Sequence, residues 1–259
     1  AQLGQSRRWH SEHIQPFSSD RKWSGCTFQS IGTYVMGAPG VIFGSDKAVM
    51  EKVNTLAAQG LRVLAIGFTA QPIRGDGLPK GLECHALIRL SDTIRKDAVE
   101  TFRFFEKEGV KLKVISGDAP LTVSAIAQKV GIEGAEKYID MSKKLDLDDY
   151  TAIAENYTVF GHVSPQQKRE LIRSLQANGH TACMTGDGVN DILAMREADC
   201  SVSMQHGSDA ARSACDFVLM SDSFSSMTSV MREGRRVINN IDQVSSLYLT
   251  KTIYSVLLS

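Results

Sequence analysis

From about residue 82 onward, short apolar runs alternate with segments of helical periodicity. The apolar runs cover residues 85–90, 113–115, 157–163, 181–184, 200–204 and 217–220. The helical patterns cover residues 96–107, 122–130, 165–177, 191–196 and 208–214. Strands that alternate with helices at this spacing form a parallel sheet covered on both faces. The sequence therefore predicts an α/β domain with a doubly wound sheet over residues 81–224, whose chemistry lies at the carboxyl ends of the strands.

The first 80 residues have a different pattern. Residues 23–44, WSGCTFQSIGTYVMGAPGVIFG, suggest a meander of antiparallel strands, followed by a helix over 47–59 and a strand over 62–68. Residues 69–80 are rich in Gly and Pro, which is typical of a joint between domains. We expect a smaller α+β domain over residues 1–80 and a separate C-terminal segment over 225–259.

Charge and cysteine content narrow the functional classes. The 29 basic residues equal the 29 acidic residues in number, so the chain lacks the basic field that nucleic-acid binding needs. The five cysteines form no C-x-x-C pair and mostly lie inside apolar runs. This usage predicts buried free thiols in a reducing compartment.

The two ends of the chain suggest a part of a longer protein. The N-terminal AQLGQSRRWH has neither an initiator Met nor the apolar core of a signal peptide. Residues 244–259 become apolar, but fall short of the about 20 apolar residues that cross a bilayer. Two interpretations are open: an amphipathic helix packed on the domain, or the start of a membrane helix.

The run MTGDGVNDILAM, residues 184–195, places two carboxylates where a strand gives way to a helix. Asp187 follows the strand and Asp191 begins the helix, so both can point at one cation. Mg²⁺ prefers a few carboxylate oxygens, and glycines let the backbone approach closely. Asn190 can add a neutral polar contact. An Asp-Gly turn followed by a helix-capping Asp is the alternative, and polar residues at other strand ends argue against it.

Lys168 lies in the first turn of the helix predicted over residues 165–177. Ser164 has the residue type of an N-cap, Pro165 stands at the first helical position and Gln167 at the third, which is a capping box by residue type. The ammonium group of Lys168 and the helix N-terminus could then face one phosphate. A solvated surface lysine is the alternative.

Three further residues, Ser116, Gly117 and Asp118, follow the apolar run 113–115. The hydroxyl of Ser116 could donate to a phosphoryl oxygen, or it could cap the helix that Pro120 opens. A hydroxyl, a lysine and an acidic pair at three strand ends form an electrostatic cradle for phosphoryl transfer. An aspartate nucleophile is not found. Asp46 is the nearest candidate, but no glycine or hydroxyl suited to closing around a phosphate surrounds it, and it lies in the other domain.

These motifs resemble those of the P-type cation-transporting ATPases, whose phosphorylation domain has a haloacid-dehalogenase-like fold. The similarity is greatest to the bacterial cation-transporting ATPase E branch. Residues 185–191 resemble the TGDGVND hinge motif, residues 116–118 resemble TGD with Ser in place of Thr, and residues 92–95, DTIR, resemble DPPR with both prolines lost. Lys168 falls where the family keeps its phosphate-binding lysine.

The resemblance implies a role for each matching residue. Asp187 would ligate Mg²⁺ and Asp191 would support that metal site. Ser116 and Lys168 would hold the phosphoryl group. The remaining residues of the matched motifs are Gly117, Asp118 and Asn190 at the catalytic site and Asp92 and Arg95 at the nucleotide site.

The first domain resembles the nucleotide-binding domain of the same family. Residues 16–25, PFSSDRKWSG, resemble its F-S-x-x-R-K-x-S segment, in which Phe17 would stack on adenine and Lys22 would approach the nucleotide. Residues 37–39 resemble its KGAPE motif, although Met36 stands at the lysine position, which puts a direct ammonium contact there in doubt. Gly37 keeps the motif, and Arg62 matches the arginine that reaches between the two domains. A core Phe17 and a surface Arg62 are the alternatives.

Residues 232–259 resemble the stalk and first turns of the fifth membrane helix of the family, which favours the membrane-helix interpretation. The DKTGT segment with the acceptor aspartate and the ion-binding membrane helices do not occur in this sequence. The sequence thus predicts the cytoplasmic part of an ATP-driven cation pump, on the cytoplasmic face of a membrane, that binds ATP and Mg²⁺ but forms no phosphoenzyme alone. The cation would cross through membrane helices outside this sequence.

Two other functions are weighed beside this prediction. A soluble haloacid-dehalogenase-type phosphatase would need its own nucleophile before the first strand of the sheet. A nucleotide-binding regulatory module would bind ATP without turnover.

Overall fold

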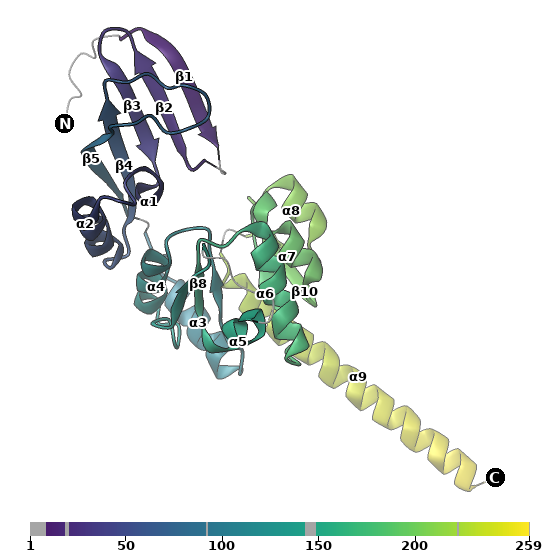
Figure 1. Cartoon of the computed structure of the whole chain (residues 1–259). Helices are drawn as coiled ribbons and strands as arrows, with labels where there is room; N and C mark the ends of the chain where they lie inside the picture. Colours follow the sequence, from purple (N-terminus) through teal and green to yellow (C-terminus); the bar gives the residue numbers. More distant parts are fainter. Residues whose placement is uncertain (1–8, 19–20, 92, 143–148, 222, 259) are drawn as a thin grey trace. The chain divides into compact units, whose positions relative to one another are not determined.

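A computed structural model describes residues 9–18, 21–91, 93–142, 149–221 and 223–258 (Figure 1). The chain forms two compact units. Unit 1 comprises residues Ala1–Thr93 and Ser116–Ile126, and unit 2 comprises Ile94–Ile115 and Ala127–Ser259.

Unit 1 contains a five-stranded antiparallel sheet in the order β1-β2-β3-β4-β5. The strands are β1 (Ser11–Ser18), β2 (Trp23–Phe28), β3 (Gly32–Gly37), β4 (Arg62–Thr69) and β5 (Glu83–Leu90). Trp23 and Val35 pack with Ile73 in the core on one face. The rings of Tyr34 and Phe68 alternate with buried residues along β3 and β4, and their centroids lie 5.0 Å apart on the other face. The predicted meander is confirmed for β2 and β3, whereas residues 39–42 at the end of the predicted stretch form a helix.

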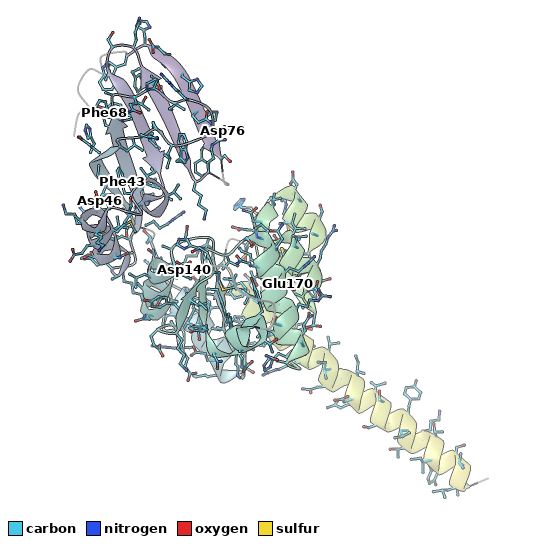
Figure 2. All side chains as sticks on the ribbon, viewed as in Figure 1. Phe43, Asp46, Phe68, Asp76, Asp140 and Glu170 are labelled. Carbon is cyan, nitrogen blue, oxygen red and sulfur yellow. The ribbon has the colours of Figure 1, made fainter. Side chains whose placement is uncertain are left out.

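The described part of the first 60 residues contains two helices, α1 (Pro39–Ile42) and α2 (Lys47–Ala57). Asp46 begins α2, because its Oδ1 accepts the backbone N–H groups of Ala48 and Val49 at 3.1 Å each (Figure 2). This cap gives Asp46 a structural role, which agrees with its rejection as the nucleophile.

Strand β5 corrects one sequence prediction. Its residues were expected to open the parallel sheet of the second domain, but β5 pairs antiparallel with β4, from Arg62 opposite Leu90 to Phe68 opposite Glu83. Two strands in this arrangement need only a short connection, whereas parallel strands need a long crossover. The 13 residues between Thr69 and Glu83 hold no helix, and they suit the antiparallel pairing.

Unit 2 holds two three-stranded parallel sheets, which confirms the predicted parallel pairing. One sheet has the order β6-β8-β7, and its strands are β6 (Val114–Ile115), β8 (Val159–Gly161) and β7 (Tyr138–Asp140). The other has the order β11-β10-β9, and its strands are β9 (Cys183–Thr185), β10 (Cys200–Met204) and β11 (Phe217–Leu219).

The helices of the second half follow most of the predicted patterns. They are α3 (Ala98–Lys107), α4 (Pro120–Lys129), α5 (Asp149–Asn156), α6 (Pro165–Ala177), α7 (Ile192–Glu197) and α8 (Asp209–Ala214). A short 3₁₀ turn, Val189–Asp191, precedes α7. Strand β7 and helix α5 were not predicted.

Among the described residues, two hydrophobic clusters lie in the core of unit 2. One contains Phe160 and Leu171, and the other contains Ile172 and Met184. Ile115 of β6 packs against both clusters. Neighbouring residues of α6 thus enter different clusters, so α6 and β6 connect the two halves of the core.

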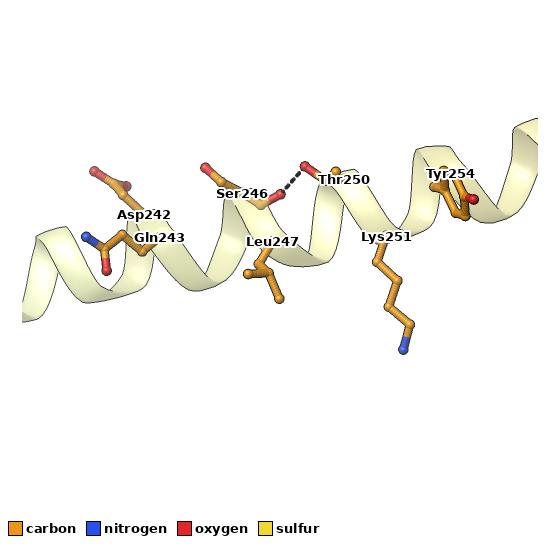
Figure 3. Close-up of a pocket in the computed structure, with 7 residues that line it drawn as sticks. All are labelled: Asp242, Gln243, Ser246, Leu247, Thr250, Lys251 and Tyr254. Carbon is orange, nitrogen blue, oxygen red and sulfur yellow. Dashed lines mark hydrogen bonds between the residues drawn. The ribbon is translucent and has the colours of Figure 1, made fainter.

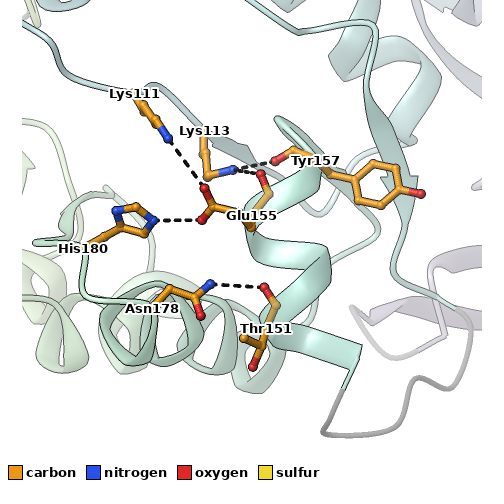
Figure 4. Close-up of polar contacts among 7 residues, drawn as sticks. All are labelled: Lys111, Lys113, Thr151, Glu155, Tyr157, Asn178 and His180. Atoms are coloured by element: carbon orange, nitrogen blue, oxygen red, sulfur yellow. Dashed lines mark hydrogen bonds and ion pairs between the residues drawn. The ribbon is translucent and has the colours of Figure 1, made fainter.

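A polar cluster stands just before the start of β6 (Figure 4). Lys113 Nζ donates to the Tyr157 carbonyl at 2.7 Å, and Glu155 lies 2.8 Å from His180 and 3.5 Å from Lys111. The hydrogen bond from His180 lowers the pKa of Glu155. Because these contacts stand at the amino end of β6, opposite to the edge where sites form in such sheets, we assign them a structural role.

The last helix, α9 (Ser226–Leu257), has 32 residues, and none of them is buried. Its first turns contact α3, where the Arg232 guanidinium lies 5.4 Å from the Phe104 ring centroid and Arg235 pairs with Glu108. The segment in Figure 3 shows a shallow hollow bordered by residues of α9 alone. The alternative that residues 244–259 pack on the domain is therefore wrong.

No helix in the part of the chain that the structure describes combines the length and the apolar character needed to cross a membrane.

The cysteines are more accessible than their apolar neighbours in the sequence suggested. Cys183 is exposed and the other four are half-buried, all as free thiols. The prediction of buried thiols is wrong: Cys183 and Cys84 lie on the edge strands β9 and β5, while Cys26, Cys200 and Cys215 are half-buried at other positions.

Candidate functional site

A capping box holds the start of α6 in unit 2. Ser164 Oγ accepts the Gln167 N–H at 3.3 Å, and Gln167 Oε1 accepts the Ser164 N–H at 2.9 Å. Gln167 Nε2 also donates to the carbonyl of Met141 at 2.7 Å. The predicted cap is confirmed, and it fixes the first turn of α6 against the sheet that contains β7 and β8.

Lys168 follows this cap and is buried. Its Nζ lies 2.6 Å from Oδ1 of Asp191, and both side chains are only 11% exposed. Two buried opposite charges at this distance form a strong, charge-assisted hydrogen bond. The alternative of a solvated surface lysine is wrong.

The glycines of the TGDGVND loop let this loop close tightly around Asp191. A Cβ at Gly186 would lie 2.5 Å from the Cβ of Asp191, so only glycine fits there without a shift. The backbone N–H of Gly188 donates to Oδ2 of Asp191 at 3.1 Å. Both carboxylate oxygens of Asp191 are therefore engaged, one by Lys168 and one by the loop.

Asp187 occupies a different environment in the same loop. Its side chain is exposed, as is that of Asn190. Its backbone carbonyl accepts the N–H of Ser208, which caps α8, at 2.8 Å. Across the described residues, the carboxylate of Asp187 has no hydrogen bond or ion pair, and no group of three His, Cys, Asp or Glu residues suited to a metal ion occurs there. The loop thus holds one free carboxylate beside one neutralised carboxylate.

Ser116 and Asp118 lie in unit 1 with Arg62. Ser116 Oγ accepts the Asp118 N–H at 3.1 Å, and Arg62 Nη2 lies 3.0 Å from Asp118 Oδ1. Thr122 Oγ1 donates to the Leu61 carbonyl at 3.3 Å. The side chains of Arg62 and Asp118 are 51% and 40% exposed, so their ion pair is weak in water, and Gly117 is exposed.

The predicted nucleotide residues of unit 1 gather at one end of its sheet. The register pairs Ser18 with Trp23 and Trp23 with Gly37, so Phe17, Lys22 and Gly37 are near neighbours. Because Gly37 pairs with Ala65, Arg62 at the start of β4 lies toward the same end. Phe17 is 63% exposed, so the alternative of a core phenylalanine is wrong.

The backbone at this end is tightly packed. A Cβ at Gly37 would lie 2.4 Å from the carbonyl oxygen of Lys22, which explains the glycine. Lys22 itself adopts a left-handed conformation, with φ at 59°, in the turn between β1 and β2. The side chain of Lys22 is exposed beyond this turn.

The remaining two predicted nucleotide residues are not placed with this group. Asp92 lies outside the described residues. Arg95 is exposed and belongs to unit 2, where its carbonyl accepts the Ala98 N–H at the start of α3. Their nucleotide role stays a prediction.

A polar pair that the sequence reasoning missed lies beside the capping box. Asp140 ends β7, and its Oδ1 lies 2.9 Å from Nδ1 of His162, which follows β8 with φ at 54°. Burial tends to raise the pKa of Asp140, but the Ser142 N–H and His162 together lower it. A polar residue at the end of an apolar run is the sequence signal that could have identified Asp140. The sequence analysis does not use it there, because it does not predict β7.

The chain was compared with known protein families and curated proteins. The family model of haloacid dehalogenase-like hydrolases matches residues 12–199, which is well over half of the chain. The chain belongs to the haloacid-dehalogenase-like hydrolase family. The predicted fold class, a haloacid-dehalogenase-like α/β domain with a smaller α+β domain, is confirmed by this match and by the parallel and antiparallel sheets.

The relatives confirm the resemblance to cation-transporting P-type ATPases. The chain is 42% identical over 246 residues to a probable cation-transporting ATPase, exp7, of Streptococcus pneumoniae, covering 94% of this chain and 31% of that protein. It is 41% identical over 255 residues to the calcium-transporting ATPase CtpE of Mycolicibacterium smegmatis, covering 97% of this chain and 32% of that protein. The chain thus spans less than a third of the length of these relatives.

Proposed function

We propose that this chain is the nucleotide-binding and phosphorylation part of an ATP-driven P-type cation pump, and that it acts on the cytoplasmic face of a membrane. The buried pair of Lys168 and Asp191, 2.6 Å apart beside the exposed Asp187, carries the proposal. Such a site keeps one carboxylate neutralised and leaves the other for a cation. The names of the relatives support cation transport as the function of the parent protein.

The donor groups present fit Mg²⁺. This ion needs only one or two carboxylates, because it keeps several waters and phosphate oxygens as ligands. We assign Asp187 as the carboxylate ligand. Since both oxygens of Asp191 already accept hydrogen bonds, we assign Asp191 to the support of the loop and of Lys168. Bound Mg²⁺ would neutralise charge on phosphate oxygens.

Lys168 has two tasks in this proposal. Its ammonium group compensates the charge of Asp191, and its remaining N–H donors can bind a phosphoryl oxygen near the N-terminus of α6. The hydroxyl of Ser116 is proposed as a second phosphoryl ligand, with Gly117 and Asp118 shaping its turn. Asn190 is proposed as a neutral polar contact of the same phosphoryl site.

In unit 1 we propose that Phe17 stacks on the adenine ring and that Lys22 and Arg62 neutralise phosphates. The exposed ring of Phe17, close to the turn that holds Lys22, supports this arrangement. NMR titration with ATP should shift amide signals near residues 17, 22, 37 and 62. Phe17→Ala should weaken ATP binding, whereas Ile14→Ala, an equally exposed apolar change on the same strand, should not. Equal weakening in both variants would remove Phe17 from the site.

A second experiment tests the catalytic part. DKTGT does not occur in this sequence, so incubation with γ-labelled ATP should leave no hydroxylamine-sensitive label on the chain. Adding a peptide or upstream segment that carries the acceptor aspartate should restore label only with intact Lys168 and Asp187. Label on the unsupplemented chain would favour the phosphatase alternative, because the nucleophile would then lie within these residues.

A further inference from the structure

Two thiols stand side by side at the starts of β9 and β10. Cys183 and Cys200 are register partners in this parallel pair, and both are free. Partner residues on neighbouring strands are about 4.8 Å apart and project to the same face of the sheet. Cys183 is exposed and Cys200 is half-buried, so a small reagent in solvent can reach the pair.

The neighbouring thiol also affects the acidity of Cys183. Burial, the neighbouring Cys200 with its hydrogen bond to Cys183, and the charge of Asp216 raise the pKa of Cys183 to about 12. Its thiol therefore keeps its proton at neutral pH. A pair in this state reacts slowly in thiol–disulfide exchange, because the thiolate is the attacking species there.

The other three cysteines offer no such pair. Cys215 Sγ donates to the carbonyls of Phe217 and Arg212, at 3.1 Å and 3.3 Å. Cys26 and Cys84 belong to β2 and β5, which are separated by β3 and β4 in the sheet of unit 1. Cys183 and Cys200 are thus the cysteines that face each other as register partners within two strands.

We propose that Cys183 and Cys200 form a bidentate binding site for trivalent arsenicals. An arsenical R–As=O reacts with both thiols: two As–S bonds form, two S–H bonds break, and the arsenic-bound oxygen leaves as water. Arsenic stays trivalent, and no oxidant or reductant is consumed. The product carries no charge, so its formation leaves no thiolate beside the charge of Asp216. Soft thiolate-type ligands are those such ions prefer.

The site can be tested with phenylarsine oxide as the probe. Trypsin separates the three neighbouring cysteines, because Cys183 lies in peptide 174–196, Cys200 in 197–212 and Cys215 in 213–232. Mass spectrometry of the treated chain should show one arsenic atom bridging the first two peptides. Two thiols held side by side bind at high effective concentration. Removing the arsenical from the wild type with a monothiol should therefore need an about 100-fold higher monothiol concentration than removing it from a variant with one of the two thiols.

Matched variants decide the outcome. Cys183→Ser and Cys200→Ser should each lose the bridged species and the resistance to monothiols. Cys215→Ser should keep both, and circular dichroism should show that all three variants fold. A bridge to peptide 213–232, or an adduct in the wild type that a monothiol strips as readily as in Cys183→Ser, would overturn the proposal.

Discussion

At the scale of single residues, the buried charges of unit 2 depend on each other. Lys168 and Asp191 are both removed from water, and a buried charge is costly unless it is paired and hydrogen-bonded. Their 2.6 Å contact and the Gly188 N–H satisfy this requirement. Removing either Lys168 or Asp191 alone should therefore lower the free energy of unfolding.

Lys168→Met tests this dependence. Since the variant leaves the carboxylate of Asp191 buried without its partner, we expect a loss of about 3–5 kcal/mol in the free energy of unfolding. Urea denaturation measures it. The control Lys111→Met removes a lysine whose side chain is 75% exposed, and should change stability by less than about 1 kcal/mol. Adding Asp191→Asn to Lys168→Met should recover part of the loss, and no recovery would contradict the pairing argument.

Gly186→Ala tests the close approach of the loop. The added Cβ would lie 2.5 Å from the Cβ of Asp191, so the loop must shift, at a cost of about 1–3 kcal/mol. Gly234→Ala in α9 is the control, because a Cβ there meets no atom within 4 Å. Thermal denaturation of both variants should show a lower midpoint for Gly186→Ala alone. Equal midpoints would mean that the loop tolerates a side chain.

At the scale of elements, the sequence predicts structure well where the hydrogen bonds are local, and poorly where strands distant in the sequence pair. The bounds of α6 match the prediction to the residue, because a capping box lies within four consecutive residues. The prediction places strand β5 in the wrong sheet, because its register partners in β4 are distant in the sequence, from Phe68 opposite Glu83 to Arg62 opposite Leu90, and apolar character does not specify them. The sequence predicts Asp187 as a cation ligand. The direct contact between Asp191 and Lys168 could not be predicted, because it forms only when the loop folds against α6.

The hydrogen bond between Asp199 and the residue before β9 predicts how the stability of the protein depends on pH. Asp199 Oδ2 accepts the Ala182 N–H at 2.8 Å, and this bond, followed by that from the Gln176 side chain, lowers the pKa of Asp199 from its ordinary 3.8. A lowered carboxyl pKa contributes stability that is present above the unfolded value and lost as pH falls through the folded value. Unfolding free energy should thus fall below pH 3.8.

The variant Asp199→Asn isolates this contribution. Its unfolding free energy, measured by urea denaturation at a series of pH values, should fall less steeply below pH 3.8 than that of the wild type. Parallel curves for the two proteins would show that Asp199 does not carry the acid sensitivity.

At the scale of the whole molecule, α9 exposes more large apolar side chains than any other described element. Leu247, Tyr248 and Leu249 are each more than 60% exposed, and none of the 32 helical residues is buried. Apolar surface of this extent on a soluble domain favours association. The compact part of unit 2 contacts only the first turns of the helix.

Truncation after residue 240 should reduce self-association of the chain without changing the stability of its fold. The truncated chain keeps the contacts of Arg232 and Arg235 with α3, so its unfolding midpoint should equal that of the whole chain. Its tendency to self-associate should fall, because the uncovered apolar residues beyond 240 are gone. Light scattering coupled to size-exclusion chromatography measures the association. A midpoint several degrees lower would show that α9 supports the fold.

Ile115 gives unit 2 a thermodynamic property of its own. One side chain is shared by both clusters, so neither cluster can open without losing contacts that the other needs. Amide hydrogens of β8 and β10 should then exchange through the same opening event, with equal free energies. Ile115→Ala should uncouple them, and the two strands would exchange at separate rates. In the wild-type chain, the two sheets of unit 2 would then be separate in their hydrogen bonding but would unfold together, because the side chain of Ile115 joins their cores.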